Sequence, residues 1–376
     1  MADWNTLLDH LASGPREDGT PELAATAAWL VEEAKRRGLE VTTWAYTAHP
    51  WRLRIAGVTA LLGAAAYALA MLRKKHVAAL LVALAVPALI IAELDFGVPL
   101  LGALHSAEQQ HVIARIPAAE APKQRLIFSA HYDTKTDLLD HVQRAPIQLL
   151  GLPVTLLMLF AALRPRPRLT KVAVTAALLN GLGLFLVQTG GAFLKGRSPG
   201  AIDDGAGCAV LLELGPRLQL QRTEVLLVFF SGEEIGIEGS REWVRRGLDR
   251  SLPAKVINLD GVGTAKSLAL FKAESGIVRR FDPDPQLVAT VEQVTPLYRT
   301  FYPATTDARS FLEAGIPALN LASDLPDHAL PRHMHSTADR RELVSTEALD
   351  DTVRVLLEVA ARLDATAPGS APASPR

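Results

Sequence analysis

The sequence has almost no cysteine, no excess of charge of either sign and no apolar stretch near its start. Its one cysteine, Cys208, excludes intramolecular disulfides and any metal site built from several thiolates. The net charge of −1 gives no long-range field that would attract nucleic acid, so we expect no nucleic-acid partner. The first 50 of the 376 residues contain Asp, Glu and Arg throughout, and we therefore predict no signal peptide.

Charged residues are also missing from four long windows. These contain no Asp, Glu, Lys or Arg and comprise Ile55–Leu72, Val77–Ala92, Ala145–Leu163 and Val172–Leu194. None has a polar face, whereas a core helix of a soluble domain is normally amphipathic. Because roughly 17–25 apolar residues form a transmembrane helix, we predict four spans, paired as helical hairpins over 55–94 and 145–194. Buried core helices are the alternative, since the shorter windows lie near the lower end of that length.

Each predicted hairpin has a basic tip. The first tip is Arg73-Lys74-Lys75-His76, and the second, residues 164–171, contains four further Lys and Arg residues. The positive-inside tendency places such tips in the cytoplasm, and this favours an extracytoplasmic position for the rest of the chain. The opposite orientation stays open, because about 50 residues would have to be exported ahead of the first span without a signal peptide.

The charged remainder alternates strand and helix patterns. Short apolar runs at Glu224–Phe230 and Lys255–Leu259 are typical of strands buried on both faces, and helical patterns fill the intervals. We therefore predict an α/β fold with a central, largely parallel mixed sheet flanked by helices and interrupted by the two hydrophobic hairpins. Residues 1–54, 95–144 and 195–364 would form one discontinuous domain, and the Ala-, Pro- and Ser-rich residues 365–376 a disordered tail.

Polar side chains follow three of the predicted strands. Sites in open α/β sheets form beyond the carboxyl ends of the strands, so we expect these side chains to meet at one edge. A Gly-rich segment before a predicted helix and a His-rich segment near the end of the chain offer further ligands. The candidates from all five segments are His131, Asp133, Asp203, Asp204, Glu233, Glu234, Asp260, His333 and His335.

Histidine and carboxylate ligands without thiols suit a hydrolytic zinc centre. Two zinc ions roughly 3.5–4 Å apart can share a bridging carboxylate, while a glutamate that binds no metal accepts the proton of the attacking water. Adjacent Glu233 and Glu234 offer one base and one ligand. Asp133 follows His131 by two residues and can accept the second N–H of that ring. Each motif alone is more often a turn, a helix cap or a solvated loop.

The order and approximate spacing of these motifs resemble the co-catalytic zinc exopeptidases of metallopeptidase family 28, over about residues 20 to 364. The family includes leucyl aminopeptidases, glutamate carboxypeptidases and glutaminyl cyclases. The motifs that carry the likeness are Ser-Ala-His131-Tyr-Asp133, Gly-Ala-Ile-Asp203-Asp204, Ser-Gly-Glu233-Glu234, Asn-Leu-Asp260 and His335-Ser-Thr-Ala-Asp339.

The resemblance implies a role for each site residue. His131 and Asp260 would bind one zinc ion, Glu234 and His335 the other, and Asp203 both. Glu233 would be the general base, Asp133 the partner of His131, and the Asp203–Asp204 peptide bond cis. Some relatives carry an oxyanion-stabilising tyrosine four residues before the position of Asp307. Pro303 stands there in this sequence, so the neighbouring Tyr302 is the candidate, and the role of Asp307 is left open.

The resemblance and the hairpins together imply a membrane-anchored di-zinc exopeptidase, in the first instance an aminopeptidase, with peptide substrates and the lipid bilayer as partners. Two other functions remain open. One is acyl transfer of the glutaminyl cyclase type, and the other is an inactive receptor or scaffold with this fold. Cleavage direction, side-chain specificity and oligomeric state are not predicted.

Overall fold

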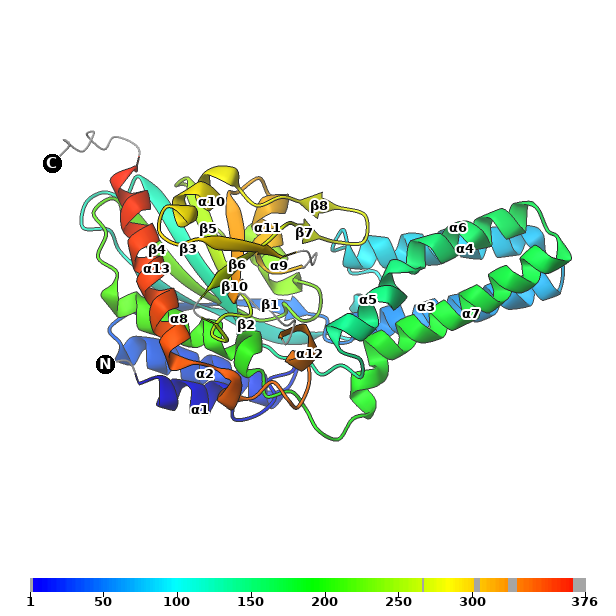
Figure 1. Ribbon diagram of the computed structural model, residues 1–376, viewed down its shortest axis with the longest axis horizontal. Helices are drawn as coiled ribbons and strands as arrows, with labels where there is room; N and C mark the ends of the chain where they lie inside the picture. Colours follow the sequence, from blue (N-terminus) through cyan, green and yellow to red (C-terminus); the bar gives the residue numbers. More distant parts are fainter. Residues whose placement is uncertain (1–2, 266, 301–304, 324–329, 368–376) are drawn as a thin grey trace.

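A sheet-centred domain and a long helical arm make up the protein in the computed structural model, which describes residues 3–265, 267–300, 305–323 and 330–367. The arm projects from one side of the domain, and α1 (Trp4–Leu11) and α13 (Thr346–Ala365) lie towards the opposite side (Figure 1). The helical arm consists of two helical hairpins, residues 52–94 and 141–193. The predicted tail, 365–376, falls largely outside the described residues, which end at Ala367.

Eight strands form the central sheet, in the order β1-β2-β4-β3-β5-β10-β6-β9. β3 runs parallel to β4 and β5, and β10 is parallel to β5, whereas β1, β2 and β6 each have an antiparallel neighbour. The prediction of a largely parallel mixed sheet is therefore confirmed at its centre. The strands are β1 (Glu40–Ala48), β2 (Ala107–Ile116), β3 (Gln124–His131), β4 (Thr223–Phe230), β5 (Ala254–Leu259), β6 (Leu268–Phe271), β9 (Leu297–Thr300) and β10 (Ala318–Ser323).

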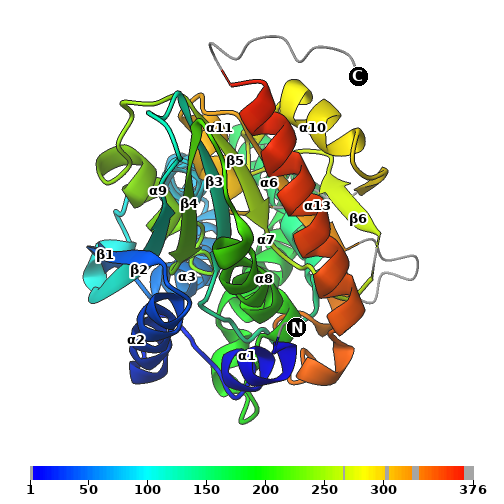
Figure 2. The same cartoon turned by 90° about the vertical axis from the view of Figure 1, so that its left-hand side faces the viewer.

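Helices cover both faces of this sheet, which explains why every residue of β3 and β4 is buried. Alternate residues of β3 enter two separate cores, Phe128 on one face and Ile127 on the other. Figure 2 shows α8 and α13 along the same side of β3 and β5. The first core receives α1 (Trp4–Leu11), α2 (Pro21–Arg36), α8 (Ala206–Leu214), α10 (Pro285–Glu292) and α13 (Thr346–Ala365), and the second α9 (Glu238–Arg246) and α11 (Ala308–Glu313).

The strands that sequence patterns missed are short. β6, β9 and β10 have four to six residues each, and β7 (Glu274–Ser275) and β8 (Arg280–Phe281) form a separate two-stranded ribbon. The runs of two or four residues contain too few alternations for a period of two to be recognised. The first two helices begin at capping side chains. Asp3 and Thr20 accept hydrogen bonds from the amides of Thr6 (3.2 Å) and Leu23 (3.3 Å), as expected for N-caps.

The helical arm contains four segments that are long and apolar enough to cross a membrane: Arg52–Leu72, His76–Leu94, His141–Leu163 and Pro167–Phe193. α3 (Arg52–Leu72) and α4 (His76–Leu94) form the first hairpin. The second comprises α5 (His141–Leu149), α6 (Gly151–Leu163) and α7 (Pro167–Thr189), followed by a 3-10 turn over Gly190–Phe193.

The arm packs small side chains inside and large apolar ones outside. Ala64, Ala83 and Ala177 are buried in its core, whereas Leu72 and Val77 are 71% and 74% exposed. A helical bundle in water has the reverse arrangement, while helices in lipid associate through small residues. The Asn180 side chain donates a hydrogen bond to the Ile147 carbonyl (2.9 Å), so this polar group faces a neighbouring helix rather than the outside of the arm. The arm thus has the packing expected of a membrane-embedded bundle.

The contact between α3 and α7 depends on Gly181. A Cβ atom there would lie 2.6 Å from Cβ of Ala64 and 3.1 Å from the carbonyl oxygen of Ala60. We expect Gly181→Leu to destabilise the arm by about 1–3 kcal/mol through overpacking. Thermal unfolding of the detergent-solubilised protein measures the loss. Gly151→Leu is the matched control, because a Cβ at Gly151 meets no atom within 4 Å. Equal melting temperatures of the two variants would contradict the inferred packing.

Candidate metal centre

The parallel strands bring the candidate ligands to one edge of the sheet. His131 is the last residue of β3, Glu233 and Glu234 follow β4, and Asp260 follows β5. Asp203 comes from the turn Ala201–Gly205 before α8, and His335 follows the short helix α12 (Leu330–His333). The carboxyl ends of neighbouring parallel strands point the same way, so side chains more than a hundred residues apart share one site.

Two groups of ligand atoms form at this edge, and Asp203 belongs to both. The first group is His131, Asp203 and Asp260, and the second is Asp203, Glu234 and His335. Within each group the ligand atoms lie within 4.8 Å of one another, and all the residues are buried. Oδ1 of Asp203 is 2.9 Å from Nε2 of His131, and its Oδ2 is 3.0 Å from Nε2 of His335. Nε2 of His335 is also 2.9 Å from Oε1 of Glu234.

These atoms fit a cation. Nε2 of His131, Oδ2 of Asp203 and Oε1 of Glu234 are buried, and none makes a well-angled hydrogen bond among the described residues, despite the short contacts just given. Buried polar atoms nearly always have a partner, and a bound metal ion would supply one to all three. Burial and the charge of Asp203 raise the pKa of Asp260 to about 8, because the cluster holds more negative charge than it can stabilise. Nitrogen and oxygen ligands in this number suit zinc.

The turn that carries Asp203 is fixed by two neighbouring carboxylates. Asp339 accepts hydrogen bonds from the amides of Ile202 (2.7 Å) and Asp203 (3.2 Å). The Asp203–Asp204 peptide bond is cis, as expected. Asp204 accepts from the amides of Gly207 (3.1 Å) and His131 (3.3 Å). The His-Ser-Thr-Ala-Asp motif therefore carries one metal-site histidine and also the acceptor that holds the shared carboxylate.

Asp133 lies beside His131, but the nearest acceptor for that ring is a main-chain oxygen. Nδ1 of His131 is 3.1 Å from the Asp133 carbonyl and 3.6 Å from its carboxylate Oδ1. The other carboxylate oxygen accepts a hydrogen bond from the amide of Glu234 (2.9 Å). Asp133 thus orients the histidine with its backbone and Glu234 with its side chain.

Sequence patterns missed the partner of the second histidine. Nδ1 of His335 lies 2.7 Å from Oδ2 of Asp137, and the Asp137 amide donates to the His335 carbonyl (2.9 Å). Burial opposes ionisation of Asp137, but Lys135, His335 and Arg144 outweigh it and hold the pKa of this carboxyl well below its usual value. Asp137 occupies a loop without a motif, and no short-range signal points to a histidine almost two hundred residues away.

Arg16 is a second residue that the sequence did not indicate. Its buried guanidinium group donates to the carbonyls of Tyr132 (2.8 Å), Pro199 (2.7 Å) and Gly200 (3.0 Å). These carbonyls belong to the segments that carry His131 and Asp203. Arg16 therefore links two ligand-bearing loops through main-chain oxygens rather than through an ion pair.

Three other candidates lie outside the two ligand groups. Glu233 belongs to neither group, and burial, with the charges of Glu234 and Asp260, raises its pKa well above the usual value. Asp307 precedes α11 and is fully buried, and burial raises its pKa to about 7. His333 ends α12 and joins neither group. Tyr302, the oxyanion candidate, lies outside the described residues.

Comparison with protein families decides the family of this chain. The model of peptidase family M28 matches residues 111–360. The chain belongs to peptidase family M28. The resemblance noted in the sequence is thereby confirmed, and the family is one of zinc-dependent metallopeptidases.

Relatives of this M28 chain include two fungal proteins, each described as a "Probable zinc metalloprotease". The one from Pyrenophora teres f. teres (strain 0-1) is 35% identical over 132 residues, which cover 34% of this chain and 26% of the relative. The one from Pyrenophora tritici-repentis (strain Pt-1C-BFP) is 36% identical over 106 residues, which cover 27% of this chain and 22% of the relative. The matched stretch thus spans about a quarter of each relative's length.

Solved structures share the fold at low sequence identity. A glutaminyl cyclase of Porphyromonas gingivalis has a TM-score of 0.53 at 18% identity, covering 94% of this chain and 95% of its own. The LapA aminopeptidase of Legionella pneumophila has a TM-score of 0.52 at 15% identity, and the match covers 97% of this chain and 71% of the aminopeptidase. A Zn-dependent exopeptidase of Parabacteroides distasonis has a TM-score of 0.54 at 15% identity, and the match covers 94% of each chain. The predicted architecture, a mixed sheet flanked by helices as in zinc exopeptidases, is confirmed.

Asp137→Asn should weaken zinc binding at His335 about 10–100-fold, because the ring loses the charged acceptor that fixes its orientation. Competition with a chromogenic chelator measures the affinity of the purified M28 chain. Asp249→Asn is the control, since Asp249 is an exposed carboxylate that contacts Arg125 and Ser251 on another part of the domain. Unchanged zinc affinity in Asp137→Asn would contradict the role assigned to this carboxylate.

The zinc-free protein should lose stability as the pH rises from 3.8 to about 8. Asp260 stays protonated in the folded, zinc-free state across this window but ionises in the unfolded chain, so deprotonation favours unfolding. Saturating zinc should remove most of this slope, because the cation compensates the ionised carboxylate. Thermal unfolding with and without zinc across the window tests this. Zinc-free protein that becomes more stable with rising pH would contradict it.

Proposed function

We propose that this M28 peptidase is a membrane-anchored exopeptidase, in the first instance an aminopeptidase, that uses two zinc ions. The observation that carries the proposal is the pair of His and carboxylate groups that share Asp203, with Glu233 beside them and in neither group. In this proposal His131 and Asp260 hold one ion, Glu234 and His335 the other, and Asp203 both. Residues 1–54, 95–144 and 195–364 form the single catalytic domain.

The chemistry then divides between the metal site and Glu233. Zinc, when bound, lowers the pKa of a water molecule and polarises the peptide carbonyl. Glu233 accepts the proton of the attacking water as its oxygen bonds to the carbonyl carbon. The same carboxyl returns a proton to the leaving nitrogen as the peptide bond breaks, which yields a free amine and a carboxylate. Burial, with the charges of Glu234 and Asp260, raises the pKa of Glu233, which makes its carboxylate a stronger base than that of an exposed glutamate.

The position of the site supports substrates close to a membrane. The ring of His335 lies 4.6 Å from the ring of His141, which begins the candidate span His141–Leu163. Arg144 in the same segment contacts Asp137, the partner of His335. A peptide that reaches these ligands therefore comes within a few residues of the predicted bilayer boundary. The basic hairpin tips favour an extracytoplasmic site.

Glutaminyl cyclase chemistry is the second candidate. Its support is the Porphyromonas gingivalis cyclase, which matches this fold over 95% of its own chain. Both reactions use a base beside a metal-polarised carbonyl, so a substrate panel has to separate them. An inactive scaffold is disfavoured, because such a protein has no need to retain both ligand groups and Glu233.

Glu233→Gln should reduce peptide hydrolysis about 100- to 10,000-fold, because the amide cannot accept the water proton. Zinc content should stay unchanged, since Glu233 is in neither ligand group. Aminoacyl reporters, amino-blocked peptides and N-terminal glutaminyl peptides distinguish aminopeptidase, carboxypeptidase and cyclase activity. Glu342→Gln, at an exposed position, is the control. Hydrolysis that survives Glu233→Gln, or a wild-type protein that binds no zinc, would refute the proposal.

A further inference from the structure

Three exposed apolar side chains lie together on the domain beside the first hairpin. Phe96, two residues beyond the end of α4, is 52% exposed, and Ile277 and Val278, between β7 and β8, are 50% and 55% exposed. We call these three residues the turn patch. The guanidinium of Arg279, adjacent to Val278, lies over the Phe96 ring at 4.5 Å, which joins the two parts of the patch.

The sequence of this turn is unusual for its position. Residues 276–279 read Gly-Ile-Val-Arg, whereas tight turns favour Gly, Pro, Asn, Asp and Ser. Two neighbouring β-branched apolar residues at an exposed tip cost solubility and contribute nothing to turn formation. Gly276 itself is required, because a Cβ atom there would collide with the Asp95 carboxylate and the Arg309 guanidinium. The presence of this exposed apolar pair is therefore best explained by a contact between the tip and a surface outside this chain.

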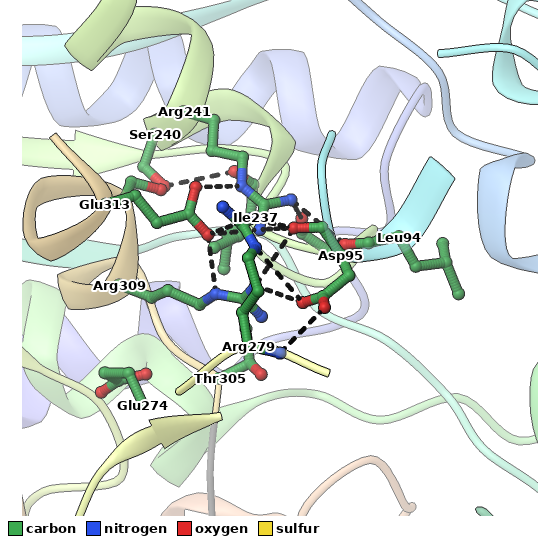
Figure 3. Close-up of polar contacts among 12 residues, drawn as sticks. Leu94, Asp95, Ile237, Ser240, Arg241, Glu274, Arg279, Thr305, Arg309 and Glu313 are labelled. Atoms are coloured by element: carbon green, nitrogen blue, oxygen red, sulfur yellow. Dashed lines mark hydrogen bonds and ion pairs between the residues drawn. The ribbon is translucent and has the colours of Figure 1, made fainter. Parts of the chain in front are cut away.

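Asp95, the residue that follows α4, fixes the turn at the end of a candidate span. Its Oδ2 accepts hydrogen bonds from the amides of Val278 (2.9 Å) and Arg279 (3.1 Å). Its Oδ1 forms a buried ion pair with Arg309. Figure 3 shows Asp95 between the arginine side chains and the main chain of the turn. The tip is thus held against the segment by which the chain leaves α4.

Three arginines make this attachment rigid. Glu313 accepts from Arg241 (2.8 Å), Arg279 (2.8 Å) and Arg309 (2.7 Å), as Figure 3 shows. Arg241 also donates to the carbonyl oxygens of Leu94 (3.2 Å) and Asp95 (3.1 Å) at the carboxyl end of α4. Cations there complement the helix dipole. The turn patch therefore keeps a fixed position relative to α4.

We propose that the turn patch inserts into the boundary between headgroups and acyl chains of a phospholipid bilayer, beside α4. This rests on the membrane insertion of α4 that the proposed function includes. Asp95 lies three residues beyond Ala92, the last residue of the charge-free window, a rise of about 4.5 Å. Interfacial segments bury their apolar side chains roughly 5–10 Å deep, so the tip is within reach of the boundary.

Continuity with the span favours lipid over a protein partner. Leu81 and Leu84 on the outside of α4 are exposed, and so are Leu100 and Leu104 in the segment that follows it. The turn patch extends this apolar surface from the arm onto the domain. Arg280 next to the tip is exposed and pairs with the exposed Asp282, so its charged head suits lipid phosphates in the headgroup layer.

The same ribbon reaches the candidate active site. Oε2 and Oε1 of Glu274 in β7 accept hydrogen bonds from the amide (2.8 Å) and hydroxyl (2.9 Å) of Thr306. Asp307 is the next residue. Strand β7 thus connects the turn patch, at the proposed bilayer surface, to the segment that carries Asp307 beside the metal site.

Site-directed fluorescence tests the turn patch in the full-length protein in phospholipid nanodiscs. Ile277→Cys and Val278→Cys each receive an environment-sensitive dye, and Cys208 is buried, so the wild type supplies the labelling background. Lipids with a spin label near the top of the acyl chain act as quenchers. Leu84→Cys, on the outer surface of α4, is the positive control, with a quencher near the chain end. Glu358→Cys on α13, away from the arm in Figure 1, is the negative control.

We expect the dye at 277 and 278 to emit at shorter wavelength than at 358 and to be quenched by the shallow spin label. Emission and quenching equal to those at 358 would overturn the proposal. If Leu84 is quenched and 277 and 278 are not, the span stands and the turn patch fails. If 277 and 278 are quenched and Leu84 is not, the patch stands as a peripheral contact and membrane insertion of α4 fails. If none of the three is quenched, both fail.

Discussion

The site depends on one carboxylate placed between two histidine rings. Asp203 approaches His131 with one oxygen, at 2.9 Å, and His335 with the other, at 3.0 Å, and all three side chains are buried. A buried carboxylate is costly unless hydrogen bonds or cations compensate it. Asp339 holds the backbone of this turn, and Glu234 and Asp260 complete the two ligand groups. The fold therefore brings together more negative charge than its own cations balance, and a metal ion supplies the difference.

Much of this site could be predicted because its ligands follow buried strands. The apolar runs before His131, Glu233 and Asp260 mark the strand ends, and sheet geometry then places those side chains at one edge. Asp137 and Arg16 could not be found in this way. Each lies in an irregular loop, and its contacts are made to segments far away in the sequence. Patterns of local period carry no information about such pairs, and the same limit concealed the short strands after residue 267.

Ion pairs gather at the base of each hairpin, where the helical arm meets the domain. Arg52 and Glu93 pair at 3.0 Å where α3 begins and α4 ends, and both side chains are buried. Asp95 pairs with Arg309 just beyond, and Arg144 pairs with Asp137 at the start of the second hairpin. The apolar middle of the arm is free of such pairs among the described residues. Charged contacts thus lie where the arm meets the domain, while small residues pack the interior of the arm.

The bases of both hairpins lead to the same edge of the sheet. The second hairpin is linked to His335 through Asp137. The first hairpin is linked to the β7–β8 ribbon through Asp95, and Glu274 of that ribbon binds Thr306, the residue before Asp307. Loops at this edge lie outside the two cores, so they accept long insertions without disturbing the packing of β3 and β4. They also carry the ligands. An insertion that spans a membrane from this edge therefore brings the metal site to the bilayer surface, whichever side of the membrane the domain occupies.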